Sequence, residues 1–231
     1  MSLKEQLAEF RVGWYQRVPA ERQAVIQRHI DHLRASRIVR TMLKVGDRAP
    51  AITLSNARGK SVDVRLLLKR GPVILTFYRG GWCPYCNLEL RAYQDVLSEI
   101  NAAGASLVAI SPEKPDESLS TAEKNALAFE VLSDVGLKVG RAFGLVYEFT
   151  DELKSAYQGF GLDIPARNGS PGEWALPVSA TYVIGRDGTI IYAHTDVDYR
   201  DRADPLDVIE VLTMQHKLGM TRRAPVARVR Q

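Results

Sequence analysis

The most informative segment of the chain reads Pro72-Val73-Ile74-Leu75-Thr76-Phe77-Tyr78-Arg79-Gly80-Gly81-Trp82-Cys83-Pro84-Tyr85-Cys86. Residues 72–78 are apolar and rich in β-forming side chains, which predicts a central strand buried on both faces. A long helical stretch at residues 88–103 follows and ends at Gly104. Cys83 and Cys86 therefore lie between the carboxyl end of a buried strand and the start of a helix, where open α/β sheets place their sites.

Short strands and helices alternate on both sides of this segment, from about residue 50 onward. Asp187-Gly188 predicts the tight turn of a late β-hairpin. Residues 147–175 are rich in Gly, Pro and polar side chains, and we interpret them as an irregular insertion with one short helix. This order predicts an α/β domain whose mixed central sheet carries helices on both faces. The further strands are expected at residues 52–54, 62–64, 106–110, 130–132, 181–184 and 189–192, and the further helices at about 115–126 and 205–218.

A helical extension precedes this domain. Apolar residues recur at helical spacing in residues 3–14 and again in residues 25–33, and the segment 44–50 then breaks the pattern. The apolar stripe of the extension must pack on the main domain or on a second subunit of a homodimer, and the sequence leaves both open. We therefore divide the chain into an N-terminal helical extension, a main domain and a basic C-terminal tail, at residues 1–43, 44–218 and 219–231.

The composition argues against several classes of protein. The chain is 45% hydrophobic and 25% charged, with a net charge of +4, which is ordinary for a soluble globular protein. It has no apolar run of about 18 residues and no signal-peptide pattern, so we expect a cytoplasmic protein without a membrane partner. We see no basic face suited to nucleic acid, and we interpret the tail as a solubilising end. The basic excess lies partly at Arg222, Arg223, Arg228 and Arg230.

The chain has only two cysteines, Cys83 and Cys86, and they lie three residues apart. In a cytosolic chain, Cys-x-x-Cys beside a strand–helix pattern is typical of a redox centre. A zinc site would need two further ligands. His29 and His32 form the only close histidine pair, but they are distant in sequence and are expected at the surface, so we predict no metal. The alternative is a pair of inert, buried thiols.

The helix start favours Cys83 as the nucleophile. Only the thiolate is reactive, and a cysteine with an ordinary pKa of about 8.5 is mostly protonated at neutral pH. A helix N-terminus lowers that pKa, and Pro84 suits the first helical turn because its missing N–H would have no intrahelical partner. We expect Cys83 to be the more exposed cysteine. Cys86 follows at a distance of about 5–6 Å, which a disulfide can bridge.

Arg79 and Trp82 flank the two cysteines. Arg79 either lowers the pKa of Cys83 or is a solvated loop charge. Trp82 covers the thiol, offers a docking surface for a partner, or packs against the edge of the sheet. Farther along the chain, Asp134 is expected to cap a helix rather than to act as a catalytic acid. We interpret the charged stretch 198–202 as a surface ion-pair cluster and assign it no catalytic role.

Several motifs occur in a characteristic order and spacing at residues 45–50, 73–86, 110–113, 132–134, 143–145, 181–184 and 187–188. In these motifs the chain resembles, over about residues 44–218, the peroxiredoxin-like family often called the alkyl hydroperoxide reductase and thiol-specific antioxidant family. Residues 77–86 are similar to the subgroup with a Cys-x-x-Cys site. The resemblance implies a thioredoxin-like fold of the peroxiredoxin type. It also implies that Cys83, followed by Pro84, stands where the family carries its peroxide-attacking cysteine.

Three positions depart from the pattern of that family. Gly80 stands where the family has a threonine, Thr76 where it has a proline, and Ser179 where it has an arginine. In family members those groups hold and polarise the peroxide O–O bond, so Arg79, Ser179 or Thr181 would have to substitute for them. Cys-Pro-Tyr-Cys is also typical of glutaredoxins, and a preceding Trp of thioredoxins, but Ser179 occupies the expected place of their cis-proline.

The cysteine pair and the resemblance together predict a thiol-dependent peroxidase that needs no cofactor. Cys83 would attack hydrogen peroxide or an organic hydroperoxide and become a sulfenic acid. Cys86 would condense with it to an intrachain disulfide, and thioredoxin or a glutaredoxin-like dithiol would restore both thiols. Two alternatives stay open. One is a protein disulfide reductase with little peroxidase activity, and the other is a redox-sensing binding protein that acts through its N-terminal helices.

Overall fold

The computed structural model describes the backbone of residues 1–221 and the side chains of residues 1–215. The strands are β1 (Thr53–Asn56), β2 (Ser61–Asp63), β3 (Val73–Phe77), β4 (Ser106–Ser111), β5 (Glu130–Ser133), β6 (Val146–Glu148), β7 (Ala175–Pro177), β8 (Ala180–Ile184) and β9 (Ile190–Thr195). The helices are α1 (Leu3–Arg17), α2 (Ala20–Ala35), α3 (Ile38–Thr41), α4 (Val64–Leu68), α5 (Pro84–Asp95), α6 (Leu97–Ala102), α7 (Pro115–Lys124), α8 (Lys138–Ala142), α9 (Asp151–Gly159), α10 (Ile164–Asn168) and α11 (Pro205–Thr221).

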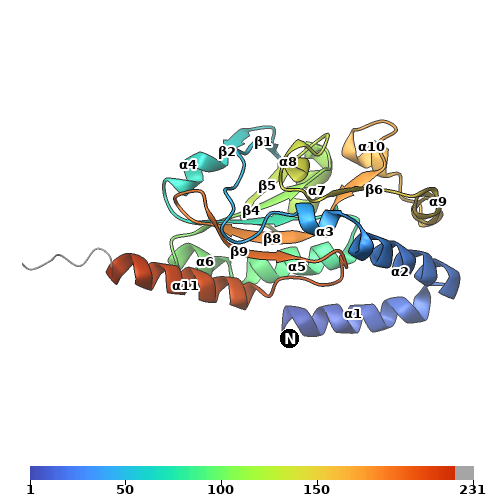
Figure 1. Cartoon of the computed structure of the whole chain (residues 1–231), viewed down its shortest axis with the longest axis horizontal. Coiled ribbons are helices and arrows are strands. Elements are labelled where there is room, and N and C mark those ends of the chain that lie inside the picture. Colours follow the sequence, from blue (N-terminus) through green and yellow to red (C-terminus); the bar gives the residue numbers. More distant parts are fainter. Residues whose placement is uncertain (222–231) are drawn as a thin grey trace, which may run out of the picture.

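A seven-stranded sheet runs through the molecule in the order β2-β1-β5-β4-β3-β8-β9, and β6 pairs with β7 beside it (Figure 1). β3 lies inside this sheet, parallel to β4 and antiparallel to β8. All five residues of β3 are buried. Leu75 and Phe77 join a core with Phe143 and Tyr182, whereas Ile74 faces the side covered by α5, α6 and α11. The predicted buried central strand and the mixed sheet are confirmed.

Residues 147–175 are more regular than the sequence suggested. β6 and β7 pair antiparallel, and both α9 and α10 lie between them in the chain. The prediction of an irregular insertion with one short helix was therefore wrong. Thr150 and Asp163 cap these helices by accepting hydrogen bonds from the backbone N–H groups of Leu153 and Ala166. Single capping residues in a polar stretch also resemble loop residues, which is why the composition concealed two helix starts.

Two other helices differ in their bounds from the sequence expectation. The predicted helix at residues 88–103 begins earlier, at Pro84, and divides near Val96 into α5 and α6. α11 runs to Thr221 and so enters the predicted tail at 219–231. The rest of that tail, with its four arginines, lies outside the described residues. Within residues 1–221, no helix combines the length and the apolar character that crossing a bilayer requires.

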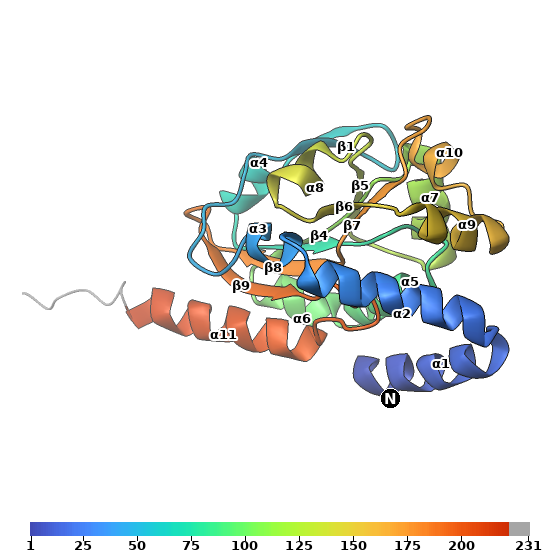
Figure 2. The same cartoon turned by 45° about the vertical axis from the view of Figure 1, so that its right-hand side comes forward.

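The N-terminal helices pack on the main domain, as Figure 2 shows for α1 beside α5. Leu3 and Leu7 of α1 belong to the apolar cluster that also contains Leu90 of α5. α2 lies against α9. Its Ile30 and Leu33 belong to the large core on the face of the sheet that carries Leu75 and Phe77. The N-terminal extension therefore packs as part of the main domain and contributes to its apolar cores.

His29 of α2 is buried, contrary to the prediction that it lies at the surface. Its side chain packs against the rings of Tyr147 and Phe149, with centroid distances of 5.0 and 6.4 Å, and neither ring nitrogen has a hydrogen-bond partner. Burial, followed by the charges of Arg79 and His32, lowers the pKa of His29 to about 4. The sequence of α2 did not reveal this burial, because most of its side chains are charged or polar and few apolar residues mark the buried face. His32, three residues on, is exposed as expected.

Candidate active site

Cys83 is the N-cap residue of α5, and Pro84 is its first helical residue. The carbonyl of Cys83 accepts the N–H of Asn87 at 3.1 Å, so the helix begins at the cysteine itself. Both thiols are free. Cys83 and Cys86 are only 1% and 0% exposed, so both are buried and the expected difference in exposure between them is very small. The position of Cys83 at a helix start was predicted correctly.

Two glycines shape the loop between β3 and α5. Gly80 has a φ of +146°, a conformation that L side chains rarely adopt, and a Cβ there would overlap Trp82 Nε1. A Cβ at Gly81 would overlap Thr121 Oγ1. The N–H of Gly81 donates to the Glu113 carboxylate at 2.8 Å. The loop is therefore packed without spare room, and position 80 does not admit the threonine of the family pattern.

Arg79 and Arg202 each place a guanidinium group beside one sulfur. Arg79 Nη1 lies 3.6 Å from Cys83 Sγ, and Arg202 Nη2 lies 3.4 Å from Cys86 Sγ. Arg202 also forms a buried ion pair with Glu89, which follows Cys86 by three residues on α5. A positive charge this close to a thiol favours the thiolate, and the absence of bulk water strengthens the effect.

Aromatic rings hold Arg79 in place. The centre of its guanidinium group lies 3.8 Å from the ring of Tyr199, 4.9 Å from that of Trp82 and 5.7 Å from that of Tyr157. It also donates to the hydroxyl of Tyr157. Arg79 is thus a buried partner of Cys83 rather than a solvated loop charge. Trp82 packs on Arg79 and edge-on against Tyr157, so it covers the site from one side.

The two thiols differ in acidity. Burial alone would raise the pKa of Cys83, but hydrogen bonding from Cys86 and the positive charges of Arg79 and Arg202 outweigh it and lower the pKa to about 5. Burial raises the pKa of Cys86 well above its ordinary value, and the neighbouring sulfur of Cys83 adds to this increase. At neutral pH the pair therefore carries one negative charge, and that charge lies on Cys83.

The charged stretch 198–202 is the main correction to the sequence analysis. It was interpreted as a surface cluster without a role, yet Asp198, Arg200 and Arg202 are 7%, 6% and 8% exposed. Arg202 reaches Cys86, and Tyr199 covers Arg79. Alternating acids and bases are equally typical of a solvated loop, so no local signal distinguishes the two cases. The contacts arise only when the loop after β9 folds back over α5.

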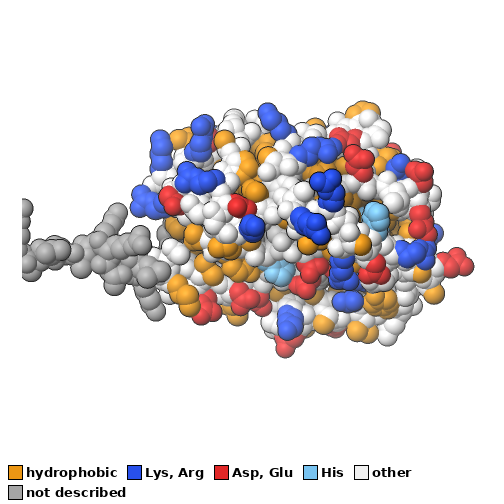
Figure 3. All heavy atoms as spheres, in the orientation of Figure 1, with side chains coloured by type: hydrophobic (Ala, Val, Ile, Leu, Met, Phe, Trp, Pro, Cys, Tyr) orange, Lys and Arg blue, Asp and Glu red, His pale blue; other side chains and the backbone are white. Residues whose placement is uncertain are grey.

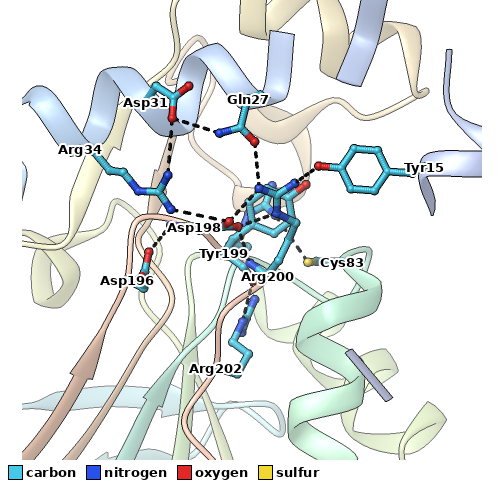
Figure 4. Close-up of polar contacts among 11 residues, drawn as sticks. Tyr15, Gln27, Asp31, Arg34, Cys83, Asp196, Asp198, Tyr199, Arg200 and Arg202 are labelled. Atoms are coloured by element: carbon cyan, nitrogen blue, oxygen red, sulfur yellow. Dashed lines mark hydrogen bonds and ion pairs between the residues drawn. The ribbon is translucent and has the colours of Figure 1, made fainter. Parts of the chain in front are cut away.

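This loop also connects the site to the N-terminal helices (Figure 4). Arg200 donates to Asp198 at 2.6 and 2.7 Å, to the hydroxyl of Tyr15 on α1 at 3.0 Å, and to the amide oxygen of Gln27 on α2 at 3.2 Å. Arg34 of α2 approaches Asp198 at 3.9 Å. We call the loop at residues 196–204 the charged loop. Side chains of α1 and α2 therefore hold it in place.

A pocket of about 260 Å³ leads to Cys83. Its walls are largely apolar and come from segments far apart in the sequence, including α1, α2, α9 and the charged loop. Because α1 and α2 supply a wall, the N-terminal extension takes part in the site. The lining residues are Phe10, Trp14, Ile26, Arg79, Trp82, Cys83, Pro84, Tyr85, Tyr157, Phe160, Leu162 and Tyr199.

The side chains of Ser179, Thr181 and Asp134 form no hydrogen bond with Cys83. Ser179 is buried, and its hydroxyl has no hydrogen-bond partner. Thr181 Oγ1 lies 3.4 Å from Thr76 Oγ1 and 3.4 Å from Glu89 Oε1. Of the three residues considered as substitutes for the missing threonine and arginine, Arg79 is the one with a contact to Cys83. Asp134 accepts backbone N–H groups at the start of α8, as its prediction as a helix cap requires.

Comparisons with known proteins agree with this geometry. The model of the AhpC/TSA family matches residues 45–193. A putative peroxiredoxin of Mycobacterium tuberculosis (strain CDC 1551 / Oshkosh) is 30% identical over 157 residues, which are 68% of this chain and 88% of that protein. The putative peroxiredoxin bcp of Haemophilus influenzae is 35% identical over 104 residues, which are 45% of this chain and 66% of that protein.

The fold agrees with that of solved peroxiredoxins. The crystal structure of peroxidoxin BcpB from Mycobacterium tuberculosis matches with a TM-score of 0.59 and 22% identity, over 74% of this chain and 97% of that chain. The predicted thioredoxin-like fold of the peroxiredoxin type, with N-terminal helices before it, is confirmed. Because the family model matches more than half of the sequence, the chain belongs to the AhpC/TSA family.

Proposed function

We propose that this chain is a peroxiredoxin-type thiol peroxidase that reduces hydrogen peroxide or an organic hydroperoxide through Cys83. The observation that carries the proposal is the pair of buried guanidinium groups, one on each sulfur of a Cys-x-x-Cys pair at a helix start. With a pKa of about 5, Cys83 is a thiolate at neutral pH without any other base. The pocket above it gives a small hydroperoxide a way to the sulfur.

In the first step the Cys83 thiolate attacks the terminal oxygen of the hydroperoxide. An S–O bond forms as the O–O bond breaks, the sulfur is oxidised to sulfenic acid, and the leaving oxygen takes a proton and departs as an alcohol or as water. Arg79 lies beside the sulfur and is therefore placed to stabilise the negative charge that develops on the leaving oxygen. In this way Arg79 substitutes for the threonine and arginine that Gly80 and Ser179 replace.

In the second step Cys86 attacks the sulfenic sulfur of Cys83, and an intrachain disulfide and water form. A dithiol of the thioredoxin or glutaredoxin type then reduces the disulfide by exchange, and no organic cofactor takes part. Such a cycle needs a reducing compartment, which supports a cytoplasmic location. Because Cys86 lies in the first turn of the helix that Cys83 caps, resolution within one chain needs no thiol from another segment or another copy.

Mass spectrometry after one equivalent of hydrogen peroxide tests this cycle. The native protein should lose two hydrogen atoms in mass and run as a monomer on a non-reducing denaturing gel. Cys86→Ser should accumulate sulfenic or sulfinic acid on Cys83, because nothing resolves it. Cys83→Ser should lose peroxidase turnover altogether.

An abundant disulfide-linked dimer of the native protein, or unchanged turnover in Cys83→Ser, would contradict the proposed cycle. Thiol titration before the reaction is the control, since it verifies that each variant starts fully reduced.

A second candidate function is that of a protein disulfide reductase with little peroxidase activity. Gly80 and Ser179 favour it, because both positions lack the groups with which the family polarises a peroxide. The nearly complete burial of both sulfurs favours the peroxidase instead, since the pocket admits a small hydroperoxide to Cys83 in the reduced site without any rearrangement. Peroxide turnover with a thioredoxin system, compared with the reduction of insulin, separates the two functions.

A further inference from the structure

We propose that Arg202 is a further catalytic residue, which stabilises the Cys86 thiolate when Cys86 attacks oxidised Cys83, and that Glu89 is the positioning residue that holds Arg202 on that sulfur. The proposal rests on the peroxidase cycle proposed above and concerns its second step. Neither residue belongs to the motif around the cysteines, and Arg202 was assigned no catalytic role from the sequence.

Three contacts fix Arg202 against Cys86. Its Nη2 lies 3.4 Å from Cys86 Sγ, its Nη1 pairs with Glu89 Oε2, and its Nε donates to the carbonyl of Tyr199 at 2.7 Å. The side chain is 1% exposed. Cys86 and Glu89 are three residues apart on α5 and so share one face of the helix. The guanidinium bridges that face and the charged loop, and these contacts hold it beside the sulfur.

The charges around the two sulfurs explain why such a group is needed. Arg79 and Arg202 bring two positive charges, Glu89 brings one negative charge, and the Cys83 thiolate completes the balance in the reduced protein. When Cys83 becomes a neutral sulfenic acid, that balance lacks one negative charge. Ionisation of Cys86 restores it, and the thiolate then lies in contact with Arg202. The oxidation of Cys83 itself therefore activates Cys86.

Of the other titratable groups near Cys86, two tyrosines do not change this balance and one glutamate does. Tyr78 on β3 and Tyr147 on β6 are neutral, because burial raises the pKa of each phenol. Glu113, after β4, accepts the N–H of Gly81, and burial raises its pKa to about 7. Glu113 is therefore partly protonated at neutral pH, and its remaining negative charge opposes the ionisation of Cys86.

The step balances without any further reactant. The Cys86 thiolate attacks the sulfur of the Cys83 sulfenic acid, the S–S bond forms, and the S–O bond breaks. The leaving hydroxide takes up the proton that Cys86 released and departs as water. The peroxide has already supplied the oxidising equivalent, so the only requirement at this stage is an ionised Cys86.

Arg202 and Glu89 carry opposite charges, so replacing each with a neutral residue should shift the ionisation of Cys86 in opposite directions. Reduced full-length protein is mixed with one equivalent of hydrogen peroxide at several pH values and quenched with acid. Mass spectrometry then follows the oxidation of Cys83 and the formation of the disulfide separately. In Arg202→Gln, disulfide formation at neutral pH should slow at least about tenfold and its pH midpoint should rise, because one pKa unit changes the thiolate fraction tenfold.

Glu89→Gln keeps a side-chain oxygen that can accept from Arg202 but removes a negative charge near Cys86, so it should do the reverse and lower the pH midpoint of disulfide formation. A role of the pair in folding alone would shift both variants in the same direction. Arg79→Gln should slow the oxidation of Cys83 more than disulfide formation, because its contact is with the other sulfur. Arg200→Gln controls for loosening of the charged loop, since it removes an equally buried arginine of that loop that contacts neither cysteine, and it should slow disulfide formation less than Arg202→Gln does.

Equal slowing of both steps in Arg202→Gln, or a midpoint that rises or stays fixed in Glu89→Gln, would overturn the role of Arg202. If Arg202→Gln does not fold, Arg202→Lys and Glu89→Gln decide the matter. The first should keep disulfide formation within a few-fold of the native rate, and the second should still lower the midpoint. A native protein that forms no intrachain disulfide would instead refute the proposed cycle, whatever the variants do.

Discussion

At Cys83 two opposing physical effects meet. Removal from water disfavours the thiolate, whereas the guanidinium of Arg79, the charge of Arg202 and the hydrogen bond from Cys86 favour it. The second group prevails because the arginines are themselves buried, so that water does not screen their charge. The acidity of Cys83 therefore depends on side chains from two distant segments and not on the helix start alone.

The reactivity of Cys83 should follow its pKa of about 5. Its rate of alkylation by iodoacetamide should be nearly constant from pH 8 to pH 6 and should fall as the pH passes through about 5, because protonation removes the thiolate. Arg79→Gln should move this fall to a higher pH, whereas Arg200→Gln should leave it in place. Mass spectrometry identifies the labelled cysteine, and a fall near pH 8 in the native protein would contradict the low pKa.

Residues of the site differ in how far the sequence revealed them. Cys83, Pro84 and Arg79 could be found because a buried strand, a helix start and a redox motif follow one another within a few residues. Arg202 and Glu89 could not be found in this way. Arg202 reaches Cys86 across more than a hundred positions of the chain, and only the folded path of the charged loop brings them together.

At the scale of elements, α2 has an unusual property for a helix rich in charged residues. It buries His29 against the aromatic side chains of β6 and of the loop that follows it, without a hydrogen bond to either ring nitrogen. A charged imidazolium in that position would have neither water nor an acidic partner. The contact between α2 and the domain is therefore stable only while His29 is neutral.

The stability of the protein should decrease in acid because of His29. Its folded pKa of about 4 lies below its ordinary value of 6.5, so the unfolded chain binds more protons between these values. The contribution is fully present above pH 6.5 and is lost as the pH falls to about 4, by up to about 3 kcal/mol. In urea unfolding at pH 7 and pH 4.5, His29→Phe should flatten this dependence. His32→Gln, at an exposed position, should not change it.

The elements themselves were predictable to different degrees. The strands of the main sheet follow from apolar β-forming runs, and the hairpin of β8 and β9 follows from Asp187-Gly188, because these are local preferences of the backbone. α9 and α10 were missed in part since their stability comes from caps and from burial of residues such as Leu153 and Tyr157. Burial of that kind is a property of the tertiary fold.

At the scale of the whole molecule, the N-terminal helices, the charged loop and the main domain form one structure around the two sulfurs. Acidic and basic side chains are both distributed over the face seen in Figure 3. The interior of the site, by contrast, combines two arginines with one thiolate and one carboxylate. The oxidation state of two atoms therefore changes the charge balance of the core.

Reduced and oxidised protein should consequently differ in how their stability depends on pH. The folded pKa of Cys83, about 5, lies below the value of about 8.5 expected in the unfolded chain. This contribution to the reduced form is complete above pH 8.5 and is lost as the pH falls to about 5. It is on the order of a few kcal/mol. The oxidised form has no thiolate and lacks it.

Calorimetry of both forms at pH 5.5 and pH 8.5 measures this effect. The melting temperature of the reduced form, minus that of the oxidised form, should increase as the pH rises. The constraint that the disulfide places on the unfolded chain does not depend on pH. It therefore shifts the melting temperature of the oxidised form by a similar amount at both pH values. The double variant Cys83→Ser/Cys86→Ser, which can form no thiolate, should behave like the oxidised protein, and parallel curves for the two native forms would contradict the proposed charge balance.

Gly80 and Trp82 have a consequence for how this site changes in evolution. A threonine at position 80 would overlap the indole nitrogen of Trp82 and would require a φ that L side chains rarely adopt. A single mutation to the family's usual residue is therefore blocked while the tryptophan is present. Loss of the tryptophan first would remove a ring that packs on Arg79. Both substitutions are therefore harmful, so lineages with this glycine and this tryptophan should keep the two together.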